Sequence, residues 1–158
     1  MLRYMEALSG ETAIRKHEIE AASASQDTVN TLYIGGGTPS VLPLSVLRDV
    51  VKSLSAAGIS GPFREFTMEV NPEDIIEKGH EYVEGMLELG VNRVSMGVQT
   101  FDDGILKWMN RRHNAANAVK AYEILEDVGV RNISIDLIFG LPQLSSALLN
   151  ETLQKALS

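Results

Sequence analysis

Three polar side chains, Glu69, Gln99 and Asp136, stand near the ends of runs in which apolar and polar residues alternate. In FTMEVN, RVSMGVQ and ISIDLI every second residue is apolar, as in a strand whose two faces differ. The apolar faces can pack on helices, so the polar faces must line something else. If the strands are parallel, two carboxylates and an amide converge at the edge where α/β proteins bind ligands. We interpret this as a polar ligand site, with a buried polar network or plain solvent exposure as the alternative.

A run of glycines, Gly35-Gly36-Gly37, leaves the same edge directly after the strand-like TLYI and is followed by Thr38. Glycine lacks a Cβ, so its backbone amides can approach a ligand closely and positive φ angles are open to it. The run is not a Walker P-loop, because no Gly-Lys-Ser/Thr follows, and Gly35-x-Gly37-x-x-Ser40 lacks the last glycine of a dinucleotide fingerprint. The run predicts a wall of the site, with a tight structural turn as the alternative.

Short runs rich in Val, Ile and Tyr alternate with segments of helical period from residue 29 onward. The four predicted strands are Val29–Ile34, Arg64–Val70, Val91–Gln99 and Ile133–Phe139. Each is followed by a predicted helix: one with an apolar stripe before Gly58, one ending near Leu89-Gly90, one over Asn114–Val128 and one from Ser145.

A weaker helical segment, Arg3–Ala22, precedes the first strand. The pair Ser9-Gly10 should interrupt it, because a glycine inside a helix costs about 1 kcal/mol.

This βα order predicts parallel pairing with right-handed crossovers. Four strands cannot close a barrel, so the predicted fold class is α/β: a partial TIM-like (βα) barrel with about four parallel strands, forming an open sheet covered by helices. The order begins and ends on a helix, and we expect residues 1–158 to be a single domain and an internal part of a larger α/β protein. Open sheet edges predict self-association of this piece.

The composition excludes several classes of protein. The 158 residues suffice for one globular core, and a formal net charge of -7 argues against nucleic acid as a partner. No segment reaches the roughly 18 consecutive apolar residues of a membrane span, and the N-terminus lacks a secretory signal, so we expect a cytoplasmic protein. There is no cysteine, which excludes disulfides and thiolate metal sites within this chain.

Four stretches occur in a specific order and spacing: YIGGGTPS, EVNPED, GVNRVSMGVQTFDDGILKWMNRRH and ISIDLIFGLP. Together they resemble the radical S-adenosylmethionine enzymes of the oxygen-independent coproporphyrinogen III oxidase family. The resemblance implies a partial (βα)6 barrel that holds S-adenosylmethionine and a 4Fe-4S cluster. In that family the cluster transfers an electron to the sulfonium, and the resulting 5'-deoxyadenosyl radical abstracts hydrogen from the substrate.

The resemblance implies cofactor-binding roles for seven residues: Gly36, Gly37, Thr38, Glu69, Gln99, Arg111 and Asp136. The glycine motif would contact the methionine part of the cofactor, and Glu69 would lie near its amino group. Arg111 would pair with the methionine carboxylate. Gln99 and Asp136 would contact the ribose and nearby groups. No catalytic side chain and no metal ligand are implied within this chain.

One departure from the family is large. The family holds its cluster with Cys-x3-Cys-x2-Cys after the first barrel strand, and this chain has no cysteine. We expect the cluster loop and the C-terminal domain to be absent, and the chain alone to be inactive and unable to ligate a cluster. His17, His80 and His113 show no metal-ligand spacing and are interpreted as surface histidines. Trp108 and Met109 are interpreted as packing residues rather than a substrate platform.

Three functions stay open for the intact protein. The first is the oxidase, which decarboxylates two propionates of coproporphyrinogen III in haem biosynthesis. The second is the related haem-binding chaperone without oxidase activity, so the partner is porphyrinogen or haem. The third is an α/β metabolic enzyme that binds a phosphorylated metabolite at the glycine run.

Overall fold

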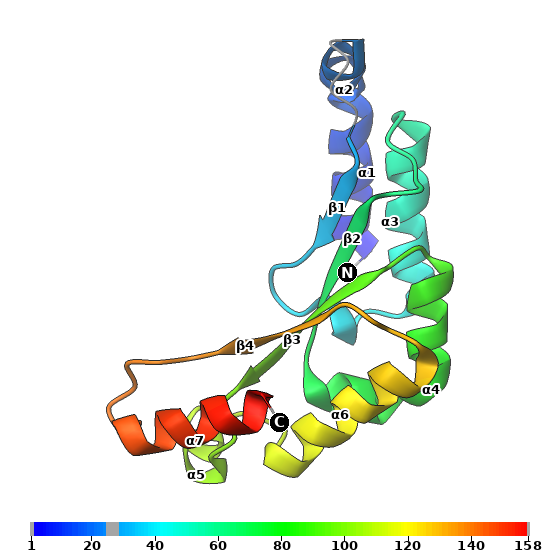
Figure 1. Cartoon of the computed structure of the whole chain (residues 1–158). Helices are drawn as coiled ribbons and strands as arrows, with labels where there is room; N and C mark the ends of the chain where they lie inside the picture. Colours follow the sequence, from blue (N-terminus) through cyan, green and yellow to red (C-terminus); the bar gives the residue numbers. More distant parts are fainter. Residues whose placement is uncertain (1, 25–28, 158) are drawn as a thin grey trace.

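A four-stranded parallel sheet organises the computed structural model, which describes residues 2–24 and 29–157. The strands are β1 (Thr31–Ile34), β2 (Glu65–Val70), β3 (Arg93–Gln99) and β4 (Ile133–Leu137), and they lie in the order β1-β2-β3-β4 (Figure 1). The α/β class and the open partial barrel predicted from the sequence are confirmed. Phe139 was assigned to the last strand, but β4 ends at Leu137 and Phe139 is 81% exposed.

The helices follow the predicted alternation. They are α1 (Leu2–Ile14), α2 (Lys16–Ala24), α3 (Leu44–Ala56), α4 (Pro72–Glu88), α5 (Asp103–Trp108), α6 (Ala115–Val128) and α7 (Ser146–Leu157), with a 3-10 turn η1 over Pro39–Val41. Asn114 and Asn117 form a reciprocal capping box at the start of α6, and Gly129 ends that helix at φ 101°. The helix predicted over 114–128 therefore has its boundaries set by local side-chain chemistry.

The first helical segment breaks at a different place from the one predicted. Gly10 lies inside α1, and the break falls at Arg15, between α1 and α2. Ser9 shares a hydrogen bond of 2.9 Å with Ser53 of α3, so a contact with a neighbouring helix holds the stretch around the glycine. A tertiary contact thus offsets a local helix cost of about 1 kcal/mol.

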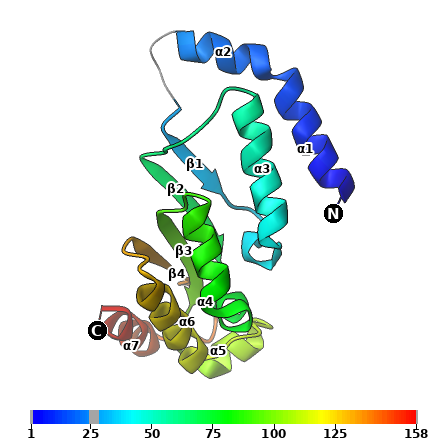
Figure 2. The same ribbon diagram turned by 90° about the vertical axis from the view of Figure 1, so that its right-hand side faces the viewer.

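The core lies between one face of the sheet and the helices α3, α4 and α6, while α1 packs against α3 (Figure 2). The predicted apolar face of the strands is buried: Phe66, Met68 and Val70 of β2 and Val94, Met96 and Val98 of β3 are each at most 2% exposed. The polar face is turned away from these helices. Helix α7 is tied to the sheet by a buried contact of 3.1 Å between the hydroxyls of Thr100 and Thr152.

Candidate functional site

A polar pocket of about 210 Å³ opens at the carboxyl ends of the strands. Its lining comprises Gly37, Thr38, Pro39, Glu69, Val70, Asn71, Ser95, Gly97, Gln99, Arg111 and Asp136. Six of the seven residues proposed from the sequence line it, and the seventh, Gly36, donates its backbone N–H to Glu69 Oε2 at 3.0 Å. The fold therefore brings together residues spread over 100 positions of the chain, from 36 to 136.

Glu69 is held by the strand and the glycine run next to it. Tyr33 donates its hydroxyl hydrogen to Glu69 Oε1 at 2.6 Å, and Gly36 donates to Oε2. A Cβ on Gly35 would stand 2.4 Å from the Tyr33 ring and 2.8 Å from the Glu69 carboxylate, so only glycine leaves room for this contact. Gly36 and Gly37 have φ angles of 78° and 66°. The run is thus both a turn and a wall of the pocket.

The hydrogen bond to Glu69 also acts on the phenol. It raises the pKa of Tyr33 above its ordinary value, because the neutral phenol donates to the carboxylate and a phenolate would be repelled by it. Desolvation and the charge of Glu69 act in the same direction.

Gln99 ends β3 in an unusual backbone conformation, with φ 70°. Its side chain lies close to Gly97: a Cβ built on Gly97 would stand 2.9 Å from Gln99 Nε2 and 3.1 Å from Asn71 Oδ1. The side chains of Gln99, Asn71 and Arg111 therefore meet next to Gly97, in the space that a larger residue would fill.

Arg111 lies in the loop between α5 and α6 and enters the pocket from its side. Its Nη2 donates to Asn71 Oδ1 at 2.9 Å and to the carbonyl of Gly97 at 3.0 Å. Its Nε is buried and has no hydrogen-bond partner. Within the described part of the chain no carboxylate lies within 4.0 Å of this guanidinium. An unpaired buried donor on a cation is costly unless an anion satisfies it, which makes Arg111 a candidate anion ligand.

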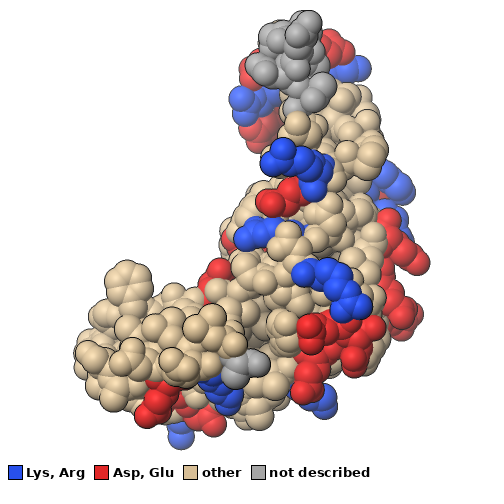
Figure 3. Space-filling model, in the orientation of Figure 1, with Lys and Arg blue, Asp and Glu red and all other residues tan. Residues whose placement is uncertain are grey.

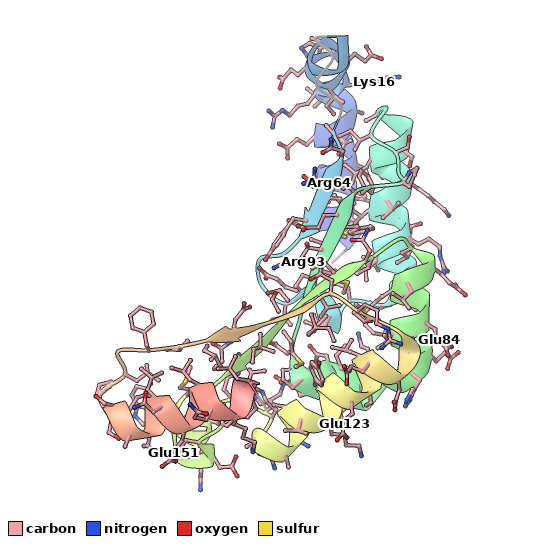
Figure 4. The ribbon with its side chains drawn as sticks, in the orientation of Figure 1. Lys16, Arg64, Glu84, Arg93, Glu123 and Glu151 are labelled. Carbon is pink, nitrogen blue, oxygen red and sulfur yellow. The ribbon has the colours of Figure 1, made fainter. Side chains whose placement is uncertain are left out.

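Asp136 and Ser95 also line the pocket. Ser95 Oγ lies 3.0 and 3.1 Å from the two carboxylate oxygens of the exposed Asp136. One layer further from the strand ends, Arg93 donates to the hydroxyls of Thr67 and Ser134 at 3.2 and 3.0 Å, on the polar face of the sheet (Figure 4). The pocket thus offers two carboxylates, a free guanidinium donor and neutral polar groups, which suit a ligand carrying an ammonium, a carboxylate and hydroxyls.

Two sequence interpretations are wrong. His113 is not a surface histidine: it is 3% exposed and bonded through both ring nitrogens. Its position beside Arg112 in a polar loop provides no signal of burial. Trp108 is not a packing residue, since it is 54% exposed at the end of the short helix α5. His17 and His80 are exposed, as predicted.

Asn71, Ser95 and Tyr33 also belong to the site and were not proposed as site residues. Strand parity already placed Asn71 and Ser95 on the polar face, and that signal could have found them. Tyr33 shares this face of β1, where the register pairs it with Thr67.

Other parts of the described surface carry fewer groups that could bind a ligand. A larger hollow of about 530 Å³ lies between α1, β1 and α3, but no charged side chain lines it. Acidic side chains gather over α4 and α6, Glu84 and Glu123 among them (Figure 3). In the described ranges, no group of three His, Asp or Glu side chains could hold a metal ion, and no helix is long and apolar enough to cross a membrane.

Comparison with known proteins identifies the family. The model of the radical SAM superfamily, where SAM denotes S-adenosylmethionine, matches residues 12–156. This chain belongs to the radical SAM superfamily. Within it, the chain is a member of the family that contains oxygen-independent coproporphyrinogen III oxidases and haem chaperones.

Curated relatives of this radical SAM chain carry both names. It is 36% identical over 138 residues to the haem chaperone HemW of Bacillus subtilis, an alignment that covers 87% of this chain and 36% of the relative. It is 30% identical over 140 residues to the oxygen-independent coproporphyrinogen III oxidase of Paracoccus denitrificans, with 89% and 30% covered. The chain therefore spans about a third of the length of these relatives.

A solved structure supports the same assignment. The coproporphyrinogen III oxidase HemN of Escherichia coli, described as a radical SAM enzyme, superposes with a TM-score of 0.82 at 27% identity, covering 97% of this chain and 33% of that one. The archaeal Elp3 of Methanocaldococcus infernus superposes with a TM-score of 0.68 at 23% identity, over 89% of this chain and 36% of that one, which shows the shared fold alone.

Proposed function

We propose that the polar pocket binds the methionine and ribose parts of S-adenosylmethionine. The observation that carries this proposal is Arg111, whose buried Nε has no partner and which lines a pocket that also contains Glu69. A cation and an anion that line one small pocket are complementary to the zwitterionic end of an amino acid. Membership of the radical SAM superfamily supports the choice of ligand.

Each proposed ligand residue has a defined task. Glu69 accepts from the ammonium of the methionine part, with Tyr33 and the Gly36 amide orienting its carboxylate. Arg111 donates to the methionine carboxylate. Gln99 and Asp136 accept from ribose hydroxyls, while Gly36, Gly37 and Thr38 form the wall along the methionine chain.

S-adenosylmethionine, held by Glu69, Arg111, Gln99 and Asp136, would supply a sulfonium for radical chemistry on reduction. The 4Fe-4S cluster that performs this reduction in the family does not fit this chain, because the chain has no cysteine to ligate it. The residues of this chain therefore bind and orient the cofactor, and no redox step is assigned to them. Residues 1–158 are on this proposal a single domain and an internal part of the (βα)6 barrel of a cytoplasmic protein.

For the intact protein we propose haem binding of the chaperone type rather than coproporphyrinogen oxidation. Of eight curated relatives at 30–36% identity, seven are haem chaperones and one is the oxidase. The oxidase, our first interpretation of the sequence, is the second candidate because the HemN structure superposes well. A phosphorylated metabolite suits the pocket less, since two carboxylates would repel a phosphate.

Ligand-observed NMR on this chain tests cofactor binding. S-adenosylmethionine should bind weakly, because the contacts that a cluster would add are missing. Glu69→Gln and Arg111→Gln should abolish the signal, whereas Arg131→Gln, a change at an exposed arginine outside the pocket, should preserve it. Equal binding by all four proteins, or displacement of the nucleoside by inorganic phosphate, would refute the proposed site.

Experiments on the intact protein distinguish the haem chaperone from the oxidase. A haem chaperone should bind haem with a Soret band that saturates stoichiometrically and should release no carbon dioxide from coproporphyrinogen III. Turnover of the porphyrinogen without stable haem binding would favour the oxidase.

A further inference from the structure

The buried His113 connects the carboxyl end of β3 to the start of α4. Its Nε2 lies 3.1 Å from the carbonyl oxygen of Val98, and its Nδ1 lies 2.9 Å from Oε2 of Glu73. Each ring nitrogen therefore has an oxygen within hydrogen-bond distance. The side chain is fully buried, so neither contact competes with water.

Arg111 joins the same two elements only two residues earlier in the loop. It donates to the carbonyl of Gly97, next to Val98, and to the side chain of Asn71, two residues before Glu73. Arg111 and His113 therefore form two parallel bridges between the end of β3 and the start of α4. The residues of the first bridge line the pocket, whereas those of the second do not belong to its lining.

The second bridge is part of a larger network that reaches the glycine run. Arg112 contacts Glu73 at 3.4 Å and the buried Asp74 at 2.8 Å. Asp74 Oδ2 accepts from Ser40 Oγ at 2.6 Å, and Ser40 Oγ accepts from the backbone N–H of Asn71 at 3.1 Å. Both acids stand in the first turn of α4, where the helix dipole favours negative charge.

Arg111 has few other restraints. Both of its side-chain hydrogen bonds come from one nitrogen, Nη2, while its backbone N–H donates to the carbonyl of Leu106 at 2.9 Å. It follows Asn110, whose φ is 56°. A long side chain in a loop keeps one orientation only if the backbone that carries it is fixed. The contacts of His113 to β3 and α4, together with those of Arg112 to α4, hold the loop that carries Arg111 against the pocket.

We propose that His113 is a positioning residue that holds the Arg111 guanidinium in place to receive the carboxylate of the methionine part of the cofactor. The inference rests on the proposed function for the identity of that carboxylate. It adds a residue that touches neither ligand nor reacting atoms, and it predicts an effect confined to the carboxylate end of the ligand.

Two replacements of His113 test its two contacts separately. His113→Gln keeps a donor near the position of Nε2, for Val98, and His113→Asn keeps a donor near Nδ1, for Glu73. His80→Gln is the matched control, since His80 is 57% exposed and its contact is a surface pair with Asp127 at 3.7 Å. Glu73→Gln removes the charge from the other end of the bridge without altering the histidine.

The affinities of this chain for S-adenosylmethionine and for decarboxylated S-adenosylmethionine, measured by ligand-observed NMR, provide the first readout. Both His113 variants should lose about tenfold in affinity for S-adenosylmethionine, the size expected for one charge-assisted contact. Affinity for the decarboxylated ligand should stay unchanged, as should both affinities in His80→Gln. Glu73→Gln should shift the first affinity in the same direction. Equal losses for both ligands, or no loss for either, would overturn the inference.

The Arg111 Nε–H resonance, assigned with Arg111→Lys, provides a readout without ligand. It should move or broaden in the His113 variants and in Glu73→Gln, but not in His80→Gln. If the wild-type chain binds neither nucleoside, the proposed function fails for this chain, and this resonance still decides the inference. An unchanged resonance in folded His113→Gln and Glu73→Gln proteins would overturn it.

Discussion

Tyr33 and Glu69, 36 residues apart in the sequence, meet at 2.6 Å with the phenol hydrogen directed at the carboxylate. The contact spans β1 and β2, and it is possible because Gly35 has no Cβ in the space between them. It orients the acid that we assign to the cofactor ammonium.

Glu69→Gln should lower the pKa of Tyr33 toward 10.0, because the hydrogen bond to Glu69 is the main cause of its raised value. Because the pKa of Tyr33 is raised, the contact is present at neutral pH and is lost as the pH rises through the pKa of Tyr33 in the folded protein. Near-ultraviolet titration of tyrosinate, with Tyr33→Phe for assignment, measures this. Tyr122, whose pKa is raised by Glu126, should titrate as before in Glu69→Gln and serves as the internal control. If Tyr33 titrated at the same pH in Glu69→Gln as in the wild-type protein, the prediction would be contradicted.

Gly97→Ala and Gly10→Ala should change stability in opposite directions. A methyl group on Gly97 would press on the side-chain ends of Gln99 and Asn71, and overpacking that displaces such flexible groups costs about 1 kcal/mol. Nothing lies within 4 Å of a Cβ on Gly10, which is inside α1, so alanine there should stabilise the protein by about 0.4–1 kcal/mol. Urea unfolding monitored by circular dichroism measures both. A Gly97→Ala protein as stable as wild type would show that the pocket can expand freely.

Asp74→Ala should destabilise the protein by about 2 kcal/mol, because the buried Ser40 hydroxyl would lose its acceptor and Arg112 its closest partner. The loss is limited by the exposure of Arg112, whose side chain is 58% exposed and stays hydrated. Asp49→Ala, on the surface of α3 with a side chain 70% exposed, is the control and should change stability little. Thermal unfolding of the two variants distinguishes them, and equal midpoints would mean that the network contributes nothing.

Anaerobic reconstitution with iron and sulfide should leave this chain colourless, because it contains no thiolate ligand. Optical and EPR spectroscopy are the measurements. A stable iron–sulfur signal stoichiometric with the protein would mean that other side chains ligate the cluster.

The chain should self-associate through the open edges of its sheet. β1 and β4 are the outer strands, and each has one side without a neighbouring strand in the described sheet. The exposed Phe139 lies just beyond β4 and adds apolar surface there. Light scattering after size-exclusion chromatography should give a mass that rises with concentration, and Phe139→Ser should lower it. A monomeric mass at every concentration would show that loops and terminal helices protect the edges.

The sequence alone determined the fold class and most of the pocket. Alternate residues of a strand face opposite sides, and parallel strands end at one edge, so parity was enough to bring Glu69, Gln99 and Asp136 together. The absence of cysteine likewise excluded a thiolate-held cluster without any structure. These are local or topological rules that do not depend on how side chains pack.

Only the tertiary structure decided the features that arise where distant segments meet. His113 is buried because the end of β3 and the start of α4 close over it with acceptors for both nitrogens, and no spacing in MNRRH encodes those partners. The helix break falls at Arg15 rather than at Gly10, since α3 supports the glycine through Ser53. The Nε of Arg111 is buried without a partner, while Asn71 and Gly97, both far from it in the sequence, bond to its Nη2. Burial and hydrogen-bond partners are set by the whole fold, and a sequence pattern reports only the part that repeats along one strand or helix.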